Sequence, residues 1–212
     1  MALLIIGCGG HSKVVSEIAE RMGKNPSFYL DDAAAAIGPH FLGRPVLAAL
    51  DQPWKGEFAV AIGHNLRRQQ VFERFLQQHP EARPATLIDP SSVVSVRCQI
   101  GAGTVVMPLC VVNAGSQIGC GVILNTRCSV DHDNQLGDFT SLAPAVALGG
   151  NLHVGERSAI GIGATVRHGL CIGADVVVGA GALVLHNLPD RCVAYGNPAR
   201  VIRSRCADDR YL

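Results

Sequence analysis

The chain has 212 residues, of which 48% are apolar and 17% charged, so it is long enough for one or two domains with buried cores and is not a disordered chain. A formal net charge of +1 gives no overall attraction to nucleic acid or to a membrane surface. No apolar run approaches the roughly 20 residues that span a bilayer, and the eight cysteines form no CxxC pair, so we expect a reduced, cytoplasmic protein.

The first 88 residues alternate short aliphatic runs with helical patterns. Residues 3–6 predict a buried parallel strand that ends in a glycine-rich turn, and residues 14–22 predict a helix with Ser12 as its N-cap and Gly23 as its stop. Further strands are expected at 28–30 and 58–62, followed by a helix that includes 72–79. This order predicts a small Rossmann-like β-α-β domain with a parallel sheet.

The turn after the first predicted strand carries part of a dinucleotide-binding pattern. Gly7 and Gly9 precede a predicted helix, and Asp31 follows about 20 residues later, but Ser12 stands where the pattern has its third glycine. The free N–H groups of such a turn and the positive end of the helix still favour a diphosphate. A plain strand-to-helix turn with solvated aspartates is the alternative.

A different pattern begins after residue 88, where an aliphatic residue occupies every sixth position from Val94 to Val184. Small or β-branched residues such as Cys98, Thr104 and Ser116 recur four positions after it. A period of six fits neither an α-helix nor a simple strand, but it fits a chain that turns a corner after each short strand. The sequence therefore predicts a three-sided coil in which residues three repeats apart stack.

His132 is the strongest catalytic candidate in the coil. It lies two positions after the interior residue Val130, so its side chain is expected to point away from the core, and Asp131 and Asp133 flank it. A carboxylate beside an imidazole fixes its tautomer and raises its basicity, as a general base requires. The alternative is an exposed turn histidine between two solvated aspartates, and the sequence leaves open which aspartate orients the ring.

The cysteines and histidines of the coil do not predict a metal site. Cys110 and Cys128 share one phase of adjacent turns, where they serve as small apolar fillers. His132 and His168 lie two turns apart, about 10 Å, which is too far for both to bind one ion within a chain. Convergence of these two with His153 across subunits would require matching phases, which they lack.

The six-residue repeat resembles that of the hexapeptide-repeat acyltransferases, whose fold is a left-handed parallel β-helix, and the segment YGNPARV at 195–201 resembles the closing segment of that family. The motifs IGCGGH at 6–11, LDD at 30–32, AIGHN at 61–65 and VILNTRCSVDHD at 122–133 are similar to those of its sugar-nucleotide acetyltransferases, especially the UDP-N-acetylbacillosamine N-acetyltransferases. The resemblance implies a nucleotide-sugar-binding domain at 1–88 and a left-handed β-helix acetyltransferase domain at 89–212.

This resemblance implies an acetyl-CoA-dependent N-acetyltransferase that acts, without a metal, on the amino group of a nucleotide-linked sugar, expected to be a 4-amino group. His132 is the implied general base, tuned by Asp133, and Asn125 is implied to lie near the amine. The residues implied to line the nucleotide-sugar site are Gly9, Gly10, His11, Asp31, Asp32 and Gly63. Those implied to contact acetyl-CoA are Ser141, where the family has a histidine, Gly150, which is also a candidate oxyanion donor, Ile162 and Ala180.

The resemblance also implies a homotrimer that binds acetyl-CoA between neighbouring β-helices. Four outward-facing apolar residues support this expectation, because they would form a large exposed patch on a monomer: Val105, Val111, Ile123 and Val177. Three alternative functions remain open at this point. They are a sugar O-acetyltransferase of the sialic-acid type, a metal-dependent β-helical hydratase and a non-catalytic scaffold.

Overall fold

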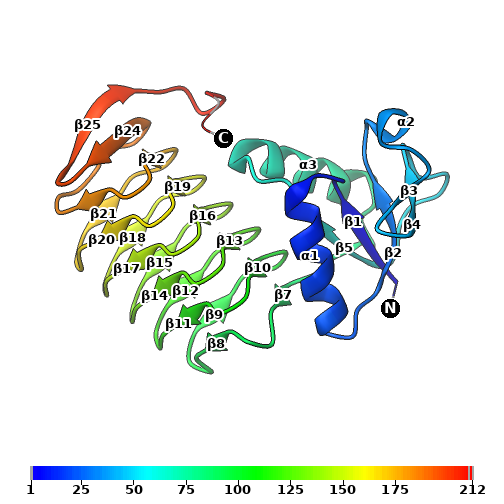
Figure 1. Ribbon diagram of the computed structural model, residues 1–212, viewed down its shortest axis with the longest axis horizontal. Helices are drawn as coiled ribbons and strands as arrows, with labels where there is room; N and C mark the ends of the chain where they lie inside the picture. The colour runs from blue at the N-terminus through cyan, green and yellow to red at the C-terminus, as the bar shows by residue number, and fades with distance from the viewer. Residues whose placement is uncertain (1, 210, 212) are drawn as a thin grey trace.

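The computed structural model describes residues 2–209 and 211. Figure 1 shows an α/β domain made by the N-terminal part of the chain beside a long coil of short strands made by the rest. The architecture changes between β6 (Arg83–Pro84), which still pairs in the N-terminal sheet, and β7 (Leu87–Ile88), which pairs with the coil strand β10 (Val105–Val106). None of the helices in the described residues combines the length and apolar character needed to cross a bilayer.

The N-terminal sheet has the strand order β3-β4-β2-β1-β5-β6, and all neighbours run parallel except β3 and β4. From β1 the chain moves to β2 and β4 on one side and then to β5 on the other, so the strand order reverses at β1. Open parallel sheets bind ligands at such a switch point. The strands are β1 (Leu3–Ile6), β2 (Pro26–Leu30), β3 (His40–Phe41), β4 (Arg44–Leu47) and β5 (Glu57–Val60), with β6 at the edge.

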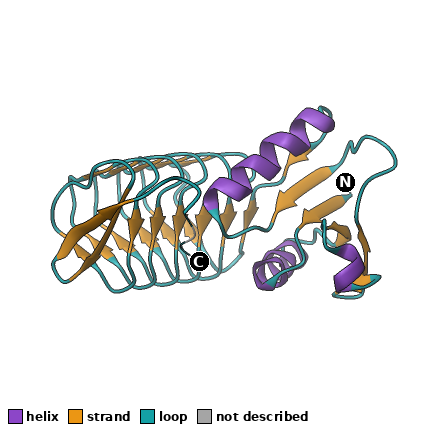
Figure 2. Ribbon diagram, turned by 90° about the horizontal axis from the view of Figure 1, so that it is seen from above, coloured by secondary structure: helices purple, strands orange, loops and turns teal. Residues whose placement is uncertain are grey.

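Two of the three helices, α1 (Gly10–Arg21) and α3 (Asn65–Gln78), cover the two faces of this sheet, and α2 (Ala34–Ile37) is a single turn at its edge (Figure 2). Leu3 and Ile5 belong to the apolar cluster that includes residues of α1, whereas Leu4 and Ile6 belong to the cluster that includes residues of α3. All four β1 side chains are buried, as a strand covered on both faces requires.

The strands and helices predicted for this domain are confirmed, but the prediction that Ser12 caps α1 is wrong. The N-cap is Gly9, whose extended backbone starts the helix three residues earlier than expected. Ser12 lies inside the first turn, where its hydroxyl donates a hydrogen bond to the Gly7 carbonyl at 2.7 Å. Gly23, with a φ of 75°, ends the helix as predicted.

The coil has three faces, each a parallel sheet of two-residue strands from successive turns. Val106 pairs with Leu124 and Leu124 with Leu142, so three six-residue repeats make one turn, as predicted. The aliphatic side chains point inward and are buried throughout the middle of the coil. At its open first turn, Val94 and Ile100 stay partly exposed because no turn lies below them.

We call the faces 1, 2 and 3. Face 1 contains β7, β10, β13 (Ile123–Leu124), β16 (Ser141–Leu142), β19 (Ala159–Ile160) and β22 (Val177–Val178). Face 2 contains β8 (Val93–Val94), β11 (Val111–Val112), β14 (Ser129–Val130), β17 (Ala147–Leu148), β20 (Thr165–Val166) and β23 (Leu183–Val184). Face 3 contains β9 (Gln99–Ile100), β12 (Gln117–Ile118), β15 (Gln135–Leu136), β18 (His153–Val154) and β21 (Cys171–Ile172).

Small side chains fill the corners of the coil. Thr104 is fully buried, and its hydroxyl donates to the Gly119 carbonyl of the next turn at 2.8 Å. Cys110 and Cys128 stack in adjacent turns with their sulfur atoms 3.5 Å apart, as predicted. An antiparallel hairpin of β24 (Cys192–Gly196) and β25 (Ala199–Ser204) extends face 1 beyond the last turn.

The N-terminal domain packs on face 1, which corrects one expectation from the sequence. Val105 and Ile123 do not form an exposed patch, because they are only 2% and 4% exposed and share an apolar cluster with Val15 and Ile18 of α1. The sequence period shows that a residue points out of the coil, but it does not show that another domain covers it. These two residues therefore give no argument for a trimer.

Arg68 of α3 ties the two domains together. Its side chain is buried and donates hydrogen bonds to the carbonyls of Gly121 and Phe139 in the coil, both at 2.8 Å. It also donates to the carbonyls of Ile62 and Gly63 in the loop after β5, both at 3.0 Å. No carboxylate accompanies the guanidinium in the described residues, and burial lowers the pKa of Arg68 to about 10.

The C-terminal tail makes a second link, because it returns to α3 (Figure 1). The backbone N–H of Asn65 donates to the Tyr211 hydroxyl at 2.8 Å, and the Asn65 side chain donates to the Arg157 carbonyl of the coil at 2.9 Å. Residues far apart in the sequence thus meet at the N-terminus of α3.

We expect Arg68→Ala to lower the free energy of unfolding by about 3–5 kcal/mol, because it leaves several buried carbonyls without donors and opens a cavity. Urea unfolding followed by circular dichroism measures the change. Arg83→Ala is the control, since Arg83 is exposed and its side chain makes no hydrogen bond within the described residues, and it should cost less than about 0.5 kcal/mol. Equal losses of unfolding free energy in the two variants would contradict the role of Arg68 in joining the two domains.

Candidate active site

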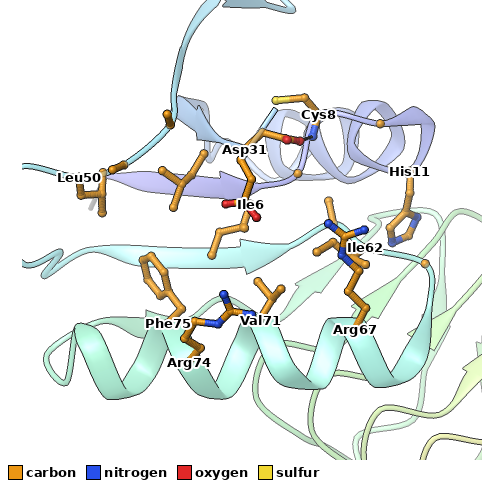
Figure 3. Close-up of a pocket in the computed structure, with 18 of the residues that line it drawn as sticks. Ile6, Cys8, His11, Asp31, Leu50, Ile62, Arg67, Val71, Arg74 and Phe75 are labelled. Carbon is orange, nitrogen blue, oxygen red and sulfur yellow. Dashed lines mark hydrogen bonds between the residues drawn. The ribbon is translucent and has the colours of Figure 1, made fainter. Parts of the chain in front are cut away.

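A cavity of about 710 Å³ lies at the switch point of the N-terminal sheet, between the loops that follow β1, β2 and β5 (Figure 3). Its position is the one that the strand order favours for a ligand. Six residues implied by the sequence to bind a nucleotide sugar all line this one cavity: Gly9, Gly10, His11, Asp31, Asp32 and Gly63.

The turn after β1 leaves room for a ligand to approach its backbone. Gly7 has a φ of 108°, and a Cβ atom there would lie 3.0 Å from the Ala61 carbonyl oxygen, so this position requires glycine. A Cβ atom at Gly9 or Gly10 would meet nothing within 4 Å. The N-terminus of α1 therefore offers backbone N–H groups and the positive end of its dipole to the cavity.

His11 is neutral at physiological pH. Burial, together with the nearby positive charge of Arg68, lowers the pKa of the His11 imidazole to about 4. Its Nε2 atom is buried without a hydrogen-bond partner in the described residues. Because an unpartnered buried ring nitrogen is costly, His11 is suited to bind a polar group of a ligand.

The two aspartates at the end of β2 differ in what they can do. Asp31 accepts hydrogen bonds from the backbone N–H groups of Cys8 at 2.8 Å and Ala33 at 2.9 Å, so both carboxylate oxygens hold the walls of the cavity together. Asp32 makes no side-chain hydrogen bond within the described residues. Of the pair, Asp32 has the carboxylate that is available to a ligand.

Among the cavity residues that the sequence did not predict are two arginines. Arg67 and Arg74 line the wall formed by α3, opposite the turn after β1 (Figure 3). Their spacing of two helical turns is a signal that could have found them, but a charged helix face usually indicates only exposure to solvent.

His132 lies at the corner between β14 and β15, where its ring is about half exposed. Its Nδ1 atom is 2.8 Å from Oδ2 of Asp133, which answers the question that the sequence left open. Asp131 instead accepts hydrogen bonds from the His132 backbone N–H at 2.8 Å and from the Asn113 side chain at 3.0 Å. The hydrogen bond to Asp133 is the main cause that raises the pKa of His132, and the charge of Asp131 adds to it.

Two glycines of neighbouring turns make room for this pair. A Cβ atom on Gly150, one turn further along the same corner, would lie 2.8 Å from both Cε1 and Nε2 of His132. Gly115, one turn before, has a φ of 78°, and a side chain there would clash with the Asp133 carboxylate. The N–H of Gly150 has no acceptor among the described residues, so it remains available as an oxyanion donor.

The other residues implied to contact substrate or acetyl-CoA lie elsewhere on the coil. Asn125, Ile162 and Ala180 lie in segments that join strands of face 1 to strands of face 2, and Ser141 begins β16 on face 1. The Asn125 side chain accepts a hydrogen bond from the N–H of Thr126 at 2.8 Å, and Ile162 is 59% exposed. One chain thus brings Gly150 to His132, but it leaves Asn125, Ile162 and Ala180 at another edge of the prism and Ser141 on face 1.

In residues 2–209 and 211, one group of three side chains could hold a metal ion, formed by Cys206, Asp208 and Asp209 in the C-terminal tail. It includes none of the coil histidines. Asp209 is instead 2.9 Å from the Arg203 guanidinium, which holds the pKa of that carboxyl below its usual range.

Residues 2–75 match the family model described as the PglD N-terminal domain. The acetyltransferase domain of PglB from Neisseria gonorrhoeae is 37% identical, with a TM-score of 0.87 over 95% of this chain and 99% of that one. PerB from Caulobacter crescentus, solved with CoA and GDP-perosamine, is 36% identical, with a TM-score of 0.86 over 96% and 98% of the two chains. WeeI from Acinetobacter baumannii is 25% identical, with a TM-score of 0.86 over 95% and 100%. No match was found among curated proteins.

The chain belongs to the hexapeptide-repeat sugar N-acetyltransferases. The expected fold, an α/β domain followed by a left-handed parallel β-helix, is confirmed. The PglB domain has also been solved with acetyl coenzyme A, which agrees with the co-substrate expected from the sequence.

We expect Asp133→Asn to lower the pKa of His132, because the substitution removes the negative charge that stabilises the protonated ring. The titration of the imidazole, followed by NMR, should therefore move to lower pH. Asp131→Asn is the matched control and should move it less, since Asp131 does not bond to the ring. A larger shift in the Asp131 variant would contradict the assignment of Asp133 as the ring partner.

Proposed function

We propose that this protein transfers the acetyl group of acetyl-CoA to an amino group, expected to be the 4-amino group, of a nucleotide-linked sugar, with His132 as the general base. The observation that carries the proposal is the His132–Asp133 pair at 2.8 Å, with Gly150 packed so closely against the ring that a side chain there would clash with it. The likeness to an enzyme solved with CoA and GDP-perosamine supports this substrate class and favours N-acetylation over O-acetylation.

In the proposed reaction, the lone pair of the sugar amine attacks the thioester carbonyl carbon. Nε2 of His132 accepts the proton that the amine loses, while Asp133 holds Nδ1–H and stabilises the imidazolium. The Gly150 N–H donates a hydrogen bond to the carbonyl oxygen as it becomes an oxyanion. The C–S bond then breaks, and the CoA thiolate takes the proton from His132 and leaves as the thiol.

The cavity of the N-terminal domain is proposed to bind the nucleotide part of the substrate. Gly9, Gly10, His11 and Asp32 supply the unengaged polar groups, and Gly63 lets the chain approach closely. Asp31 would act mainly by holding the turn after β1 in place, because its carboxylate is already bonded to two backbone N–H groups. The two aspartates, both expected to line the nucleotide-sugar site, thus have different proposed roles.

We further propose a homotrimer. The catalytic candidate His132 and the acetyl-CoA candidate Gly150 lie at one edge of the prism, whereas the acetyl-CoA candidates Ile162 and Ala180 lie at another. A closed three-fold ring would set the first edge of each chain against the second edge of its neighbour and form three equivalent clefts. In this arrangement Asn125 and Ser141 reach the amine and the cofactor from the neighbouring chain.

The proposed location is the cytoplasm, where acetyl-CoA is available and thiols stay reduced; all eight cysteines are free. The proposed domain division is 1–88 for nucleotide-sugar binding and 89–212 for acetyl transfer, except that β7 (Leu87–Ile88) pairs with β10 and so belongs to the coil.

The substrate class is tested by mixing purified protein with acetyl-CoA and matched 4-amino and 4-hydroxy nucleotide sugars, and by following release of free thiol. We expect turnover with amino sugars only. His132→Ala should lower kcat by about two to four orders of magnitude, as the loss of a general base does. His40→Ala is the control and should retain activity, because His40 is an exposed residue of β3 outside the coil and outside the cavity. Faster turnover of hydroxyl sugars, or near wild-type kcat in His132→Ala, would overturn the proposal.

A further inference from the structure

One face of α3 lines the nucleotide cavity with two cations. Arg67, Val71, Arg74 and Gln78 follow each other at helical spacing, and all four line the cavity. Seven residues separate the two arginines, which places them about 10 Å apart along the helix. Figure 3 shows Arg67 extending towards Ile62 and the side of the cavity where His11 lies, and Arg74 beside Val71 and Phe75.

Neither guanidinium has an acidic partner or a side-chain hydrogen bond among the described residues. Other arginines of the molecule do have partners: Arg157 forms two hydrogen bonds of 2.9 Å with Asp175, and Arg21 lies 3.0 Å from Asp89. The two cations on the cavity wall are therefore left for a ligand.

The two carboxylates of the cavity, Asp31 and Asp32, do not form an ion pair with Arg67 within the described residues. His11 is neutral because its pKa is about 4, and the Asp31 carboxylate is bonded to backbone N–H groups. The N-terminus of α1, on the opposite wall, adds the positive end of a dipole. Arg67 and the N-terminus of α1 thus face the cavity from two sides, and both offer positive groups to a diphosphate.

The Arg74 end has a different character. Phe75, Val71 and Leu50 line the cavity there and offer apolar surface against which a flat ring can pack. A nucleoside diphosphate has the same division, with its charge at one end and its base at the other. The separation of the two arginines along α3 suits the two ends of such a molecule.

We propose that Arg67 selects nucleoside diphosphates over monophosphates by binding the outer phosphate, and that Arg74 binds the nucleoside half. This inference rests on the proposed function and extends it by naming the residue that recognises the diphosphate. Charge-assisted hydrogen bonds from a guanidinium to a phosphate are frequently bidentate. Replacing Arg67 should therefore weaken mainly the binding of ligands that carry a second phosphate.

Isothermal titration of the intact protein with UDP, UMP, GDP and GMP tests the inference without requiring catalysis. We expect the wild type to prefer the diphosphate of at least one base. Arg67→Gln should weaken binding of that diphosphate about 10- to 100-fold and of its monophosphate by less than about 3-fold. Arg74→Gln should weaken both by the same factor, and Arg67→Lys should retain part of the preference.

Arg83→Gln removes an exposed cation outside the cavity and should leave all affinities unchanged. Thermal unfolding of each variant checks that the fold is intact. If the wild type prefers a diphosphate and Arg67→Gln keeps the same preference, the inference is wrong while the proposed function stands. If the wild type binds none of the four nucleotides, the nucleotide-linked substrate is wrong, and the inference fails with it.

Discussion

The in-register stacking of the coil is the constraint on which the rest of the molecule depends. Val130 pairs with Leu148, and each interior aliphatic residue sits on the one three repeats before it. Buried apolar side chains stabilise this register, and a shift of one residue would turn the interior residues outward. Because the register holds, corner residues form columns, and Gly150 falls directly beside the His132 ring. The geometry of the proposed catalytic pair is thus a consequence of the repeat.

The second requirement is that the cavity of the N-terminal domain be held against the coil. Arg68 achieves this with carbonyl acceptors alone, since it bonds the loop of Ile62 and Gly63 to Gly121 and Phe139. Gly63 also lines the cavity, so the same loop belongs to both the junction and the candidate substrate site. A charge buried without an acidic partner is costly. The hydrogen bonds that Arg68 donates to backbone carbonyls offset that cost here.

The sequence predicts the coil well because the six-residue period is a direct result of the packing. Each side of the coil places one aliphatic residue in the interior. It predicts the turn after β1 for a similar local reason, since Gly7 must adopt a positive φ. What it misses depends on contacts between distant segments. Val105 and Ile123 point out of the coil but are covered by another domain, and Arg67 follows the pattern of a solvated helix face. The predicted N-cap at Ser12 is wrong because the helix already begins at Gly10, and the Ser12 hydroxyl donates back to Gly7 in the turn after β1.

The central claim is that the His132 edge of one chain works with the Ala180 edge of its neighbour. Mixed trimers of His132→Ala and Ala180→Trp chains, purified by two different tags, test it most directly. Each parent should be almost inactive. A mixed ring has one interface out of three with both edges intact, so we expect about one third of wild-type kcat. Mixed trimers no more active than their parents, or a fully active monomer, would contradict the account.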